Sequence, residues 1–161
     1  MITDSGARQE FSTGAVRDVS EQKGLCRLLP LDVVYEFYTY FDQNNVVFWH
    51  INDFMETGRV ACLYNVLISQ NVYTCYETMF LEVSIHMAEG CKKYGENNWK
   101  KGIPVRFYID SALRHYFKYL RGDTDESHNR AFIWNIMCAI WTCKHKPELN
   151  DYSREVEGNE Q

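Results

Sequence analysis

Acidic, basic and imidazole side chains recur at helical spacing in the stretch EVSIHMAEGCKK. Glu82, His86, Glu89 and Lys93 follow one another at i, i+4, i+7 and i+11, which places all four along one face of a helix. Where such a face borders a cleft, its carboxylates and imidazole are groups that bind a metal ion or transfer a proton. A solvated face is the alternative, and the pattern alone leaves both open.

Two further segments carry polar groups of the same kind. Asp110 lies one turn before Arg114 and is followed by His115. Asn135 lies in an otherwise apolar segment, two turns after His128. The ordinary explanations are an i, i+4 ion pair, a packed histidine and an amide bonded to another helix. The alternative for Asn135 is a polar pocket in the core of a bundle.

The three segments are consecutive, so packing them together would bring their polar groups to one interior site. Carboxylates gathered in this way repel one another unless a cation lies between them, and oxygen ligands favour Mg²⁺ or Mn²⁺ over zinc. The predicted metal ligands are Glu82, Glu89, Asp110 and Asp125. Because Mg²⁺ commonly binds substrate phosphates, the sequence predicts a site for a small phosphorylated molecule.

The loop KKYGENNWKKGIP, residues 92–104, joins the first two of these segments. Its lysines supply point charges suited to a polyphosphate, Asn97 and Asn98 supply amide donors or turn chemistry, and Trp99 is able to stack on a base. We therefore predict that the loop holds a nucleotide. The equally weighted alternative for Trp99 is that it packs against the end of the bundle.

Helices are the elements predicted to position these groups. Apolar residues recur at helical spacing, and Pro, Gly and Asn mark the ends of the segments. The predicted ranges are 31–42, 46–57, 60–70, 73–93, 104–121 and 126–144, with Pro147 ending the last. The β-branched residues between 60 and 72 also permit a strand there. The predicted fold is thus an all-α helical bundle.

The orientation of two of these helices follows from their apolar residues. Leu81, Ile85 and Ala88 form the apolar stripe of the helix over 73–93, and we expect this stripe to face the core. The segment from Ala131 to Cys143 is apolar on every side, so it is predicted to run through the middle of the bundle.

Composition limits the classes of function. The 161 residues suffice for one domain with its own core. A net charge of −5, with acids gathered near the ends, argues against binding of nucleic-acid polymers or membranes but allows one small anionic ligand. The six cysteines show no paired metal-binding spacing and no apolar leader is visible, so a reduced, cytoplasmic protein is expected.

The predicted organisation is a flexible polar arm over residues 1–22, a single domain over 23–147 and a solvated acidic tail over 148–161. The aromatic content of YEFYTYFDQNNVVFW, residues 35–49, exceeds what a small bundle is expected to bury. Exposed patches of this kind mark interfaces, so we expect a homo-oligomer.

Residues 81–149 carry motifs that together resemble a known family. In order, they are KKYGENNW, DSALRH, RGDTDE followed by a histidine, and AF-x-WN. Their order and spacing resemble the phage and prophage dATP/dGTP diphosphohydrolase family, a MazG-like group. KGLCRLLPLDVV, residues 23–34, is a second and weaker match to the leading segment of that family.

The resemblance implies a MazG-like all-α fold in which acidic residues hold Mg²⁺, and an enzyme of phage nucleotide metabolism that cleaves a deoxynucleoside triphosphate between the α and β phosphates. With the residue pattern, it suggests catalytic roles for Glu82, Glu89, Asp110 and His115. The expected substrate contacts are Lys93, Asn98, Trp99, Lys100, Arg114, His128 and Asn135. The chain lacks the tandem acidic motif of ordinary MazG enzymes, which leaves open a protein that binds a nucleotide without cleaving it.

Overall fold

Six α-helices make up most of the computed structural model, which describes residues 6–19, 24–40 and 45–152. They are α1 (Leu31–Thr39), α2 (Val46–Thr57), α3 (Val60–Ser69), α4 (Tyr76–Tyr94), α5 (Val105–Arg121) and α6 (His128–His145). Three short 3₁₀ helices, η1 (Cys26–Leu28), η2 (Asn98–Lys101) and η3 (Pro147–Leu149), and the strands β1 (Arg8–Glu10) and β2 (Val16–Asp18) complete them. The predicted all-α bundle is confirmed, and the ambiguous segment after residue 60 is a helix.

The ends of the helices follow the chemistry of the residues that flank them. The Asn45 side chain accepts a hydrogen bond from the Val47 amide at 3.3 Å and so caps the start of α2. Gly58 and Gly122 take the left-handed conformation after α2 and α5, with φ of 66° and 85°. This conformation favours glycine, which explains why both helices end where the sequence predicts.

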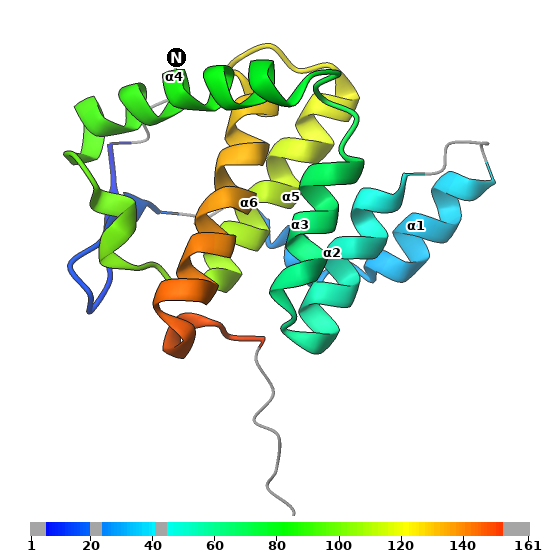
Figure 1. Ribbon diagram of the computed structural model, residues 1–161, viewed down its shortest axis with the longest axis horizontal. Coiled ribbons are helices and arrows are strands. Elements are labelled where there is room, and N and C mark those ends of the chain that lie inside the picture. Colours follow the sequence, from blue (N-terminus) through cyan, green and yellow to red (C-terminus); the bar gives the residue numbers. More distant parts are fainter. Residues whose placement is uncertain (1–5, 20–23, 41–44, 153–161) are drawn as a thin grey trace, which may run out of the picture.

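Helices α5 and α6 lie side by side at the centre of the bundle (Figure 1). Tyr108 and Tyr116 of α5 and Phe132 of α6 are fully buried between them and their neighbours, and the Tyr116 and Phe132 rings stack with centroids 4.6 Å apart. Helix α4 lies across one end of this pair. Helix α3 packs beside α6, and α2 packs beside α3. The prediction that the apolar segment of α6 runs through the middle is confirmed.

Helix α4 presents a different face to the core from the one predicted. Leu81 and Ile85 are 69% and 43% exposed, whereas Met79, Val83 and His86 are buried. The reason is that α4 is apolar on two faces and lies at the edge of the bundle, so only one face is able to pack inward (Figure 1). The inward face is the one on which the His86 ring contacts the Trp134 ring of α6, at 5.5 Å between centroids.

The N-terminal segment differs from the predicted flexible arm at residues 6–19. Strands β1 and β2 pair antiparallel, with Arg8 opposite Asp18. Ala15 in the connection is fully buried, and the Phe11 ring meets the Phe107 ring edge-on at 4.9 Å. The rest of the predicted arm, residues 1–5 and 20–22, lies outside the described residues.

Asn98 of η2 fixes this hairpin to the bundle. Its side-chain oxygen accepts a hydrogen bond from the Val16 amide at 3.1 Å, and its side-chain nitrogen donates to the Val16 carbonyl at 2.9 Å. The pairing joins residues 82 positions apart in the chain. A contact between residues so far apart leaves no local pattern in the sequence. The polar N-terminal segment is therefore predicted from the sequence as a flexible arm.

The predicted tail also packs against the bundle as far as the structure describes it. The Asn150 side chain donates to the Gly58 carbonyl at 3.1 Å, Asp151 forms an ion pair with Arg106, and the Tyr152 ring packs on Phe54 at 5.4 Å. Residues 153–161 lie outside the described part.

Part of the aromatic segment predicted to mediate self-association is exposed. Phe37, Tyr40 and Trp49 are 56%, 87% and 50% exposed, whereas Phe48 is buried against Tyr116. Residues 41–44 of the segment lie outside the described part of the chain. The homo-oligomer stays a prediction.

Replacing Asn98 with alanine should release the hairpin. Loss of both hydrogen bonds to Val16 leaves its backbone groups without partners, so the free energy of unfolding should fall by about 1–3 kcal/mol. Hydrogen exchange at the amides of β1 and β2 should quicken. Asn97→Gly is the matched control, because Asn97 is exposed and its φ of 58° suits glycine. Unchanged exchange in N98A would contradict the role given to Asn98.

Candidate functional site

A cavity of about 1150 Å³ lies between β2, α4, the loop that contains η2, α5 and α6. Ligand pockets in proteins commonly measure roughly 300–1,000 Å³, so this space accommodates a ligand as large as a nucleotide. Polar side chains from separate elements reach its wall, among them Arg17, His86, Asp110, Arg114, His115 and Asn135. Of the polar residues predicted to converge, Asp110, Arg114, His115 and Asn135 line this cavity, whereas Glu82, Glu89 and His128 do not.

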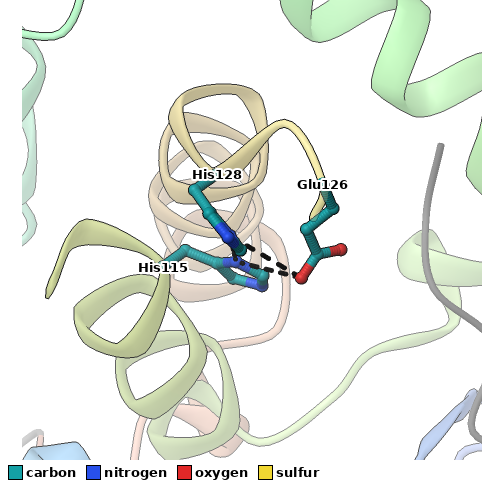
Figure 2. A group of neighbouring side chains, drawn as sticks. All are labelled: His115, Glu126 and His128. Carbon is teal, nitrogen blue, oxygen red and sulfur yellow. Dashed lines mark hydrogen bonds and ion pairs between the residues drawn. The ribbon is translucent and has the colours of Figure 1, made fainter. Parts of the chain in front are cut away.

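The closest group of potential metal ligands lies where α5 and the start of α6 meet (Figure 2). The Nδ1 atoms of His115 and His128 are 3.0 Å apart. Glu126 Oε1 lies 3.6 Å from the first and 3.7 Å from the second. Ligand atoms that share one divalent ion at roughly 2.1 Å lie about 3–3.5 Å apart, so this spacing suits a metal ion.

The proton on His128 can be assigned from its surroundings. Its Nε2 lies 2.7 Å from Asp125 Oδ1. An ionised carboxylate only accepts hydrogen bonds, so Nε2 carries the proton and a neutral ring leaves a lone pair on Nδ1. That lone pair points toward His115 and Glu126, the arrangement in which a carboxylate orients a metal-binding histidine.

Asp125 and Asp123 form a second group with the Nε2 side of His128. The hydrogen bond from His128 lowers the pKa of the Asp125 carboxyl to about 2, against the opposing effect of desolvation. Lys118 contacts the same carboxylate at 3.3 Å, and Arg121 pairs with Asp123 at 2.5 Å. Both acids therefore stay ionised at neutral pH beside the buried histidine.

Asp110 and Arg114 form the predicted i, i+4 ion pair in the cavity wall. Asp110 also accepts a hydrogen bond from the Arg27 amide at 3.2 Å, and Arg114 donates to the Gly24 carbonyl at 3.3 Å. The pair thereby joins α5 to the segment before α1. The buried Asp110 carboxylate thus contacts Arg114 and the Arg27 amide, and this group contains no second carboxylate.

The predicted ligand set is divided among different surroundings. Glu82 pairs with Arg130 at 2.5 Å, and neither Glu82 nor Glu89 lines the cavity. Two groups of the described residues have metal-binding spacing. One of them contains the predicted ligand Asp125, and neither contains Glu82, Glu89 or Asp110. Glu126, which completes the His115 and His128 group, was not predicted, although it stands beside Asp125 in the acidic run before α6.

The loop over residues 92–104 chiefly holds the protein's own chain. Lys93 forms an ion pair with Asp18 at 2.8 Å, and Asn98 binds Val16 as described above. Trp99 packs edge-on against Trp141 with centroids 5.1 Å apart, and the Lys100 ammonium lies 5.4 Å from the Trp99 ring centroid. Asn98 and Trp99 still line the cavity, but their polar or flat faces are engaged by the hairpin and α6.

The structure is a helical bundle with a large pocket lined by apolar and polar side chains, as in many proteins that bind small molecules. The model of the family "dATP/dGTP diphosphohydrolase, N-terminal" matches residues 70–152, just over half of the chain, and the chain belongs to this family. The matched region contains α4, α5, α6 and most of the cavity wall. The family is named for a hydrolase activity.

Other comparisons add no relative. No curated protein matches the chain, and no solved structure matches it either. Of the helices that the structure describes, none combines the length and the apolar character needed to cross a membrane.

The stability of the protein should depend on pH through two cavity histidines. Burial lowers the pKa of His86 to about 4, and burial together with the nearby His128 lowers that of His115 to about 2. Both values lie below the ordinary 6.5, so protons bind the unfolded chain preferentially. Stability is therefore fully present above pH 6.5 and falls as the pH drops below it.

Denaturant titrations at pH 7 and pH 5 measure this loss. The free energy of unfolding should fall by up to about 2 kcal/mol per histidine over this interval, which lies above the range where most carboxylates titrate. In His86→Leu the fall should be smaller by one such contribution. His145→Gln, at an exposed histidine, should behave as the unchanged protein does. An identical pH dependence in His86→Leu would rule out His86 as a source.

Proposed function

We propose that the protein hydrolyses dATP or dGTP to the deoxynucleoside monophosphate and pyrophosphate, with a divalent cation as cofactor. The observation that carries the proposal is the His115, Glu126 and His128 group, of which His115 and Glu126 line a nucleotide-sized cavity in the region matched to the family. Nucleotide metabolism in a phage-infected cytoplasm, the setting predicted from the sequence, belongs to the same proposal.

The cavity offers separate surroundings for the two ends of such a substrate. Arg114 and Lys118 of α5 and Arg121 beyond them line the wall near the acidic run, and their donors suit phosphate oxygens. Trp134 and Phe117 give the wall apolar aromatic surface against which a purine is able to pack. Asn135 supplies an amide in the same wall.

His115, Glu126 and His128 would hold the cation, with Asp125 orienting the His128 ring. A bound divalent cation lowers the pKa of a water ligand and neutralises phosphate charge. Carboxylate ligands favour Mg²⁺ or Mn²⁺, whereas two imidazoles with one carboxylate suit Zn²⁺ or Fe²⁺ and, of the two ions predicted from the sequence, bind Mn²⁺ more readily than Mg²⁺. We therefore propose Mn²⁺ or Mg²⁺, with Mn²⁺ the better fit to this donor set.

In this proposal the remaining groups act through charge and orientation. Lys118 contacts Asp125, and Arg114 contacts Asp110. A phosphate that enters beside them gains donors which are already fixed in position, so little ordering is needed when charge moves onto the leaving pyrophosphate. The sequence-predicted acids Glu82, Glu89 and Asp110 remain an alternative ligand set on α4 and α5.

The products identify the reaction. Mass spectrometry after incubation of dATP, dGTP and the other triphosphates with Mn²⁺ or Mg²⁺ should show monophosphate and pyrophosphate. A protein that only sequesters nucleotide would return the triphosphate intact after denaturation. That result, or inorganic phosphate as the direct product, would exclude the proposed hydrolysis.

Replacing Glu126 with glutamine should identify the metal site. The change keeps the size of the side chain but removes its charge, so kcat/KM should fall about 100-fold or more and the affinity for Mn²⁺ should fall with it. Calorimetry measures the second quantity independently of turnover. Glu77→Gln, at an exposed residue in the first turn of α4, is the matched control and should retain both.

The same assay compares the two ligand sets. If the cation lies at the histidines, Glu82→Gln should lose far less than E126Q, because Glu82 pairs with Arg130 away from the cavity wall. Full activity in E126Q together with its loss in Glu82→Gln and Glu89→Gln would place the cation on α4 instead.

A further inference from the structure

We propose that Arg17 of β2 binds a phosphate group of the nucleotide, which makes the N-terminal hairpin part of the binding site. The inference rests on the proposed function for the identity of the ligand. Arg17 lies outside the region matched to the family and comes from a segment whose sequence suggested only an arm. Its geometry carries the argument.

The Arg17 guanidinium is buried without a carboxylate partner among the described residues. The residue as a whole is half-buried, but its Nη1 has no exposed surface and no hydrogen-bond partner. Nη2 donates to Asn135 Oδ1 at 2.8 Å, and the group lies over the Tyr108 ring at 5.4 Å from its centroid. An amide and an aromatic face orient a cation, but they do not neutralise it.

Apart from Arg27, the other arginines in the described chain are neutralised in ion pairs. Six of them contact a carboxylate, namely Arg8, Arg59, Arg106, Arg114, Arg121 and Arg130. A buried charge without a counter-ion is unfavourable because it has lost its hydration, and that desolvation lowers the pKa of Arg17. An anion in the cavity would remove this cost.

The hairpin holds Arg17 in place from both sides. Val16 is bound through both its backbone groups to Asn98, and Asp18 receives hydrogen bonds from Lys93 and Tyr94 at 2.8 and 2.9 Å. On the far side, Asn135 donates to the Ala131 carbonyl at 2.7 Å, which turns its oxygen toward Arg17. The guanidinium is therefore fixed before any ligand arrives, as a specific anion site requires.

The position of Arg17 also relates it to the proposed cation site. Arg17 and His115 line the same cavity. A triphosphate that reaches from the histidines to Arg17 would meet positive charge at both ends. Because the Arg17 guanidinium has no negatively charged partner, a phosphate oxygen is a better partner for it than a neutral carbonyl oxygen of the base.

Binding of the non-hydrolysable α,β-methylene analogue of dGTP tests the role of Arg17. Calorimetry with Arg17→Met should show an affinity about 10- to 100-fold weaker, the effect of losing a hydrogen bond to a charged group. The affinity of Arg17→Lys, which keeps the charge on a shorter side chain, should lie between that of R17M and that of the unchanged protein. Deoxyguanosine, which has no phosphate, should bind all three proteins equally.

The melting temperature without ligand separates binding from a merely structural role. Removing an uncompensated buried charge should leave this temperature of R17M unchanged or raise it, whereas a guanidinium that only anchors the hairpin predicts a fall. Arg8→Met on the neighbouring strand, which loses the pair with Asp18, is the matched control and should bind the analogue within about 3-fold of the unchanged protein.

Three results would overturn the assignment: unchanged affinity of R17M for the analogue, an equal loss for deoxyguanosine, or a lowered melting temperature without ligand. Failure of the unchanged protein to bind the analogue would instead remove the proposed function, and this inference with it.

Discussion

The packing of α5 against α6 is the interaction on which the candidate site depends. Large rings from both helices, such as Tyr116 and Phe132, fill the space between them and fix their relative position. This packing brings His115 and His128 together at 3.0 Å although 13 positions separate them in the chain. A shift of either helix by a fraction of a turn would separate the imidazoles, so stability of the core and geometry of the site have one origin.

Around this pair, the cavity is closed by the hairpin, α4 and the loop over residues 92–104. Besides the apolar contacts of Phe11 and Ala15, the hairpin attaches through hydrogen bonds with Asn98, Lys93 and Tyr94. Such polar attachment is specific because a hydrogen bond fixes the relative direction of its donor and acceptor. It also makes the loop over residues 92–104 a support for the hairpin, which explains why a connector carries so many polar side chains.

Much of the fold could be predicted from the sequence because its signals are local. Helical periodicity together with Gly58, Pro104 and Gly122 located the helices to within a few residues. The choice of face on α4 could not be predicted, because two apolar faces compete and only the Trp134 contact decides between them. Arg17 and Glu126 could not be predicted for a related reason. Their contacts with Asn135 of α6 and His115 of α5 join different elements and leave no periodic pattern in the sequence.

His128 connects the interior of the protein to its surface. Its side chain is 1% exposed, yet its Nε2 donates to Asp125, whose side chain is 56% exposed. The two nitrogens belong to one conjugated ring, so a change of charge on that carboxylate alters the basicity of Nδ1 in the interior. Salt and counter-ions around Asp125 at the outer surface thus influence the electron-donating strength of a buried nitrogen.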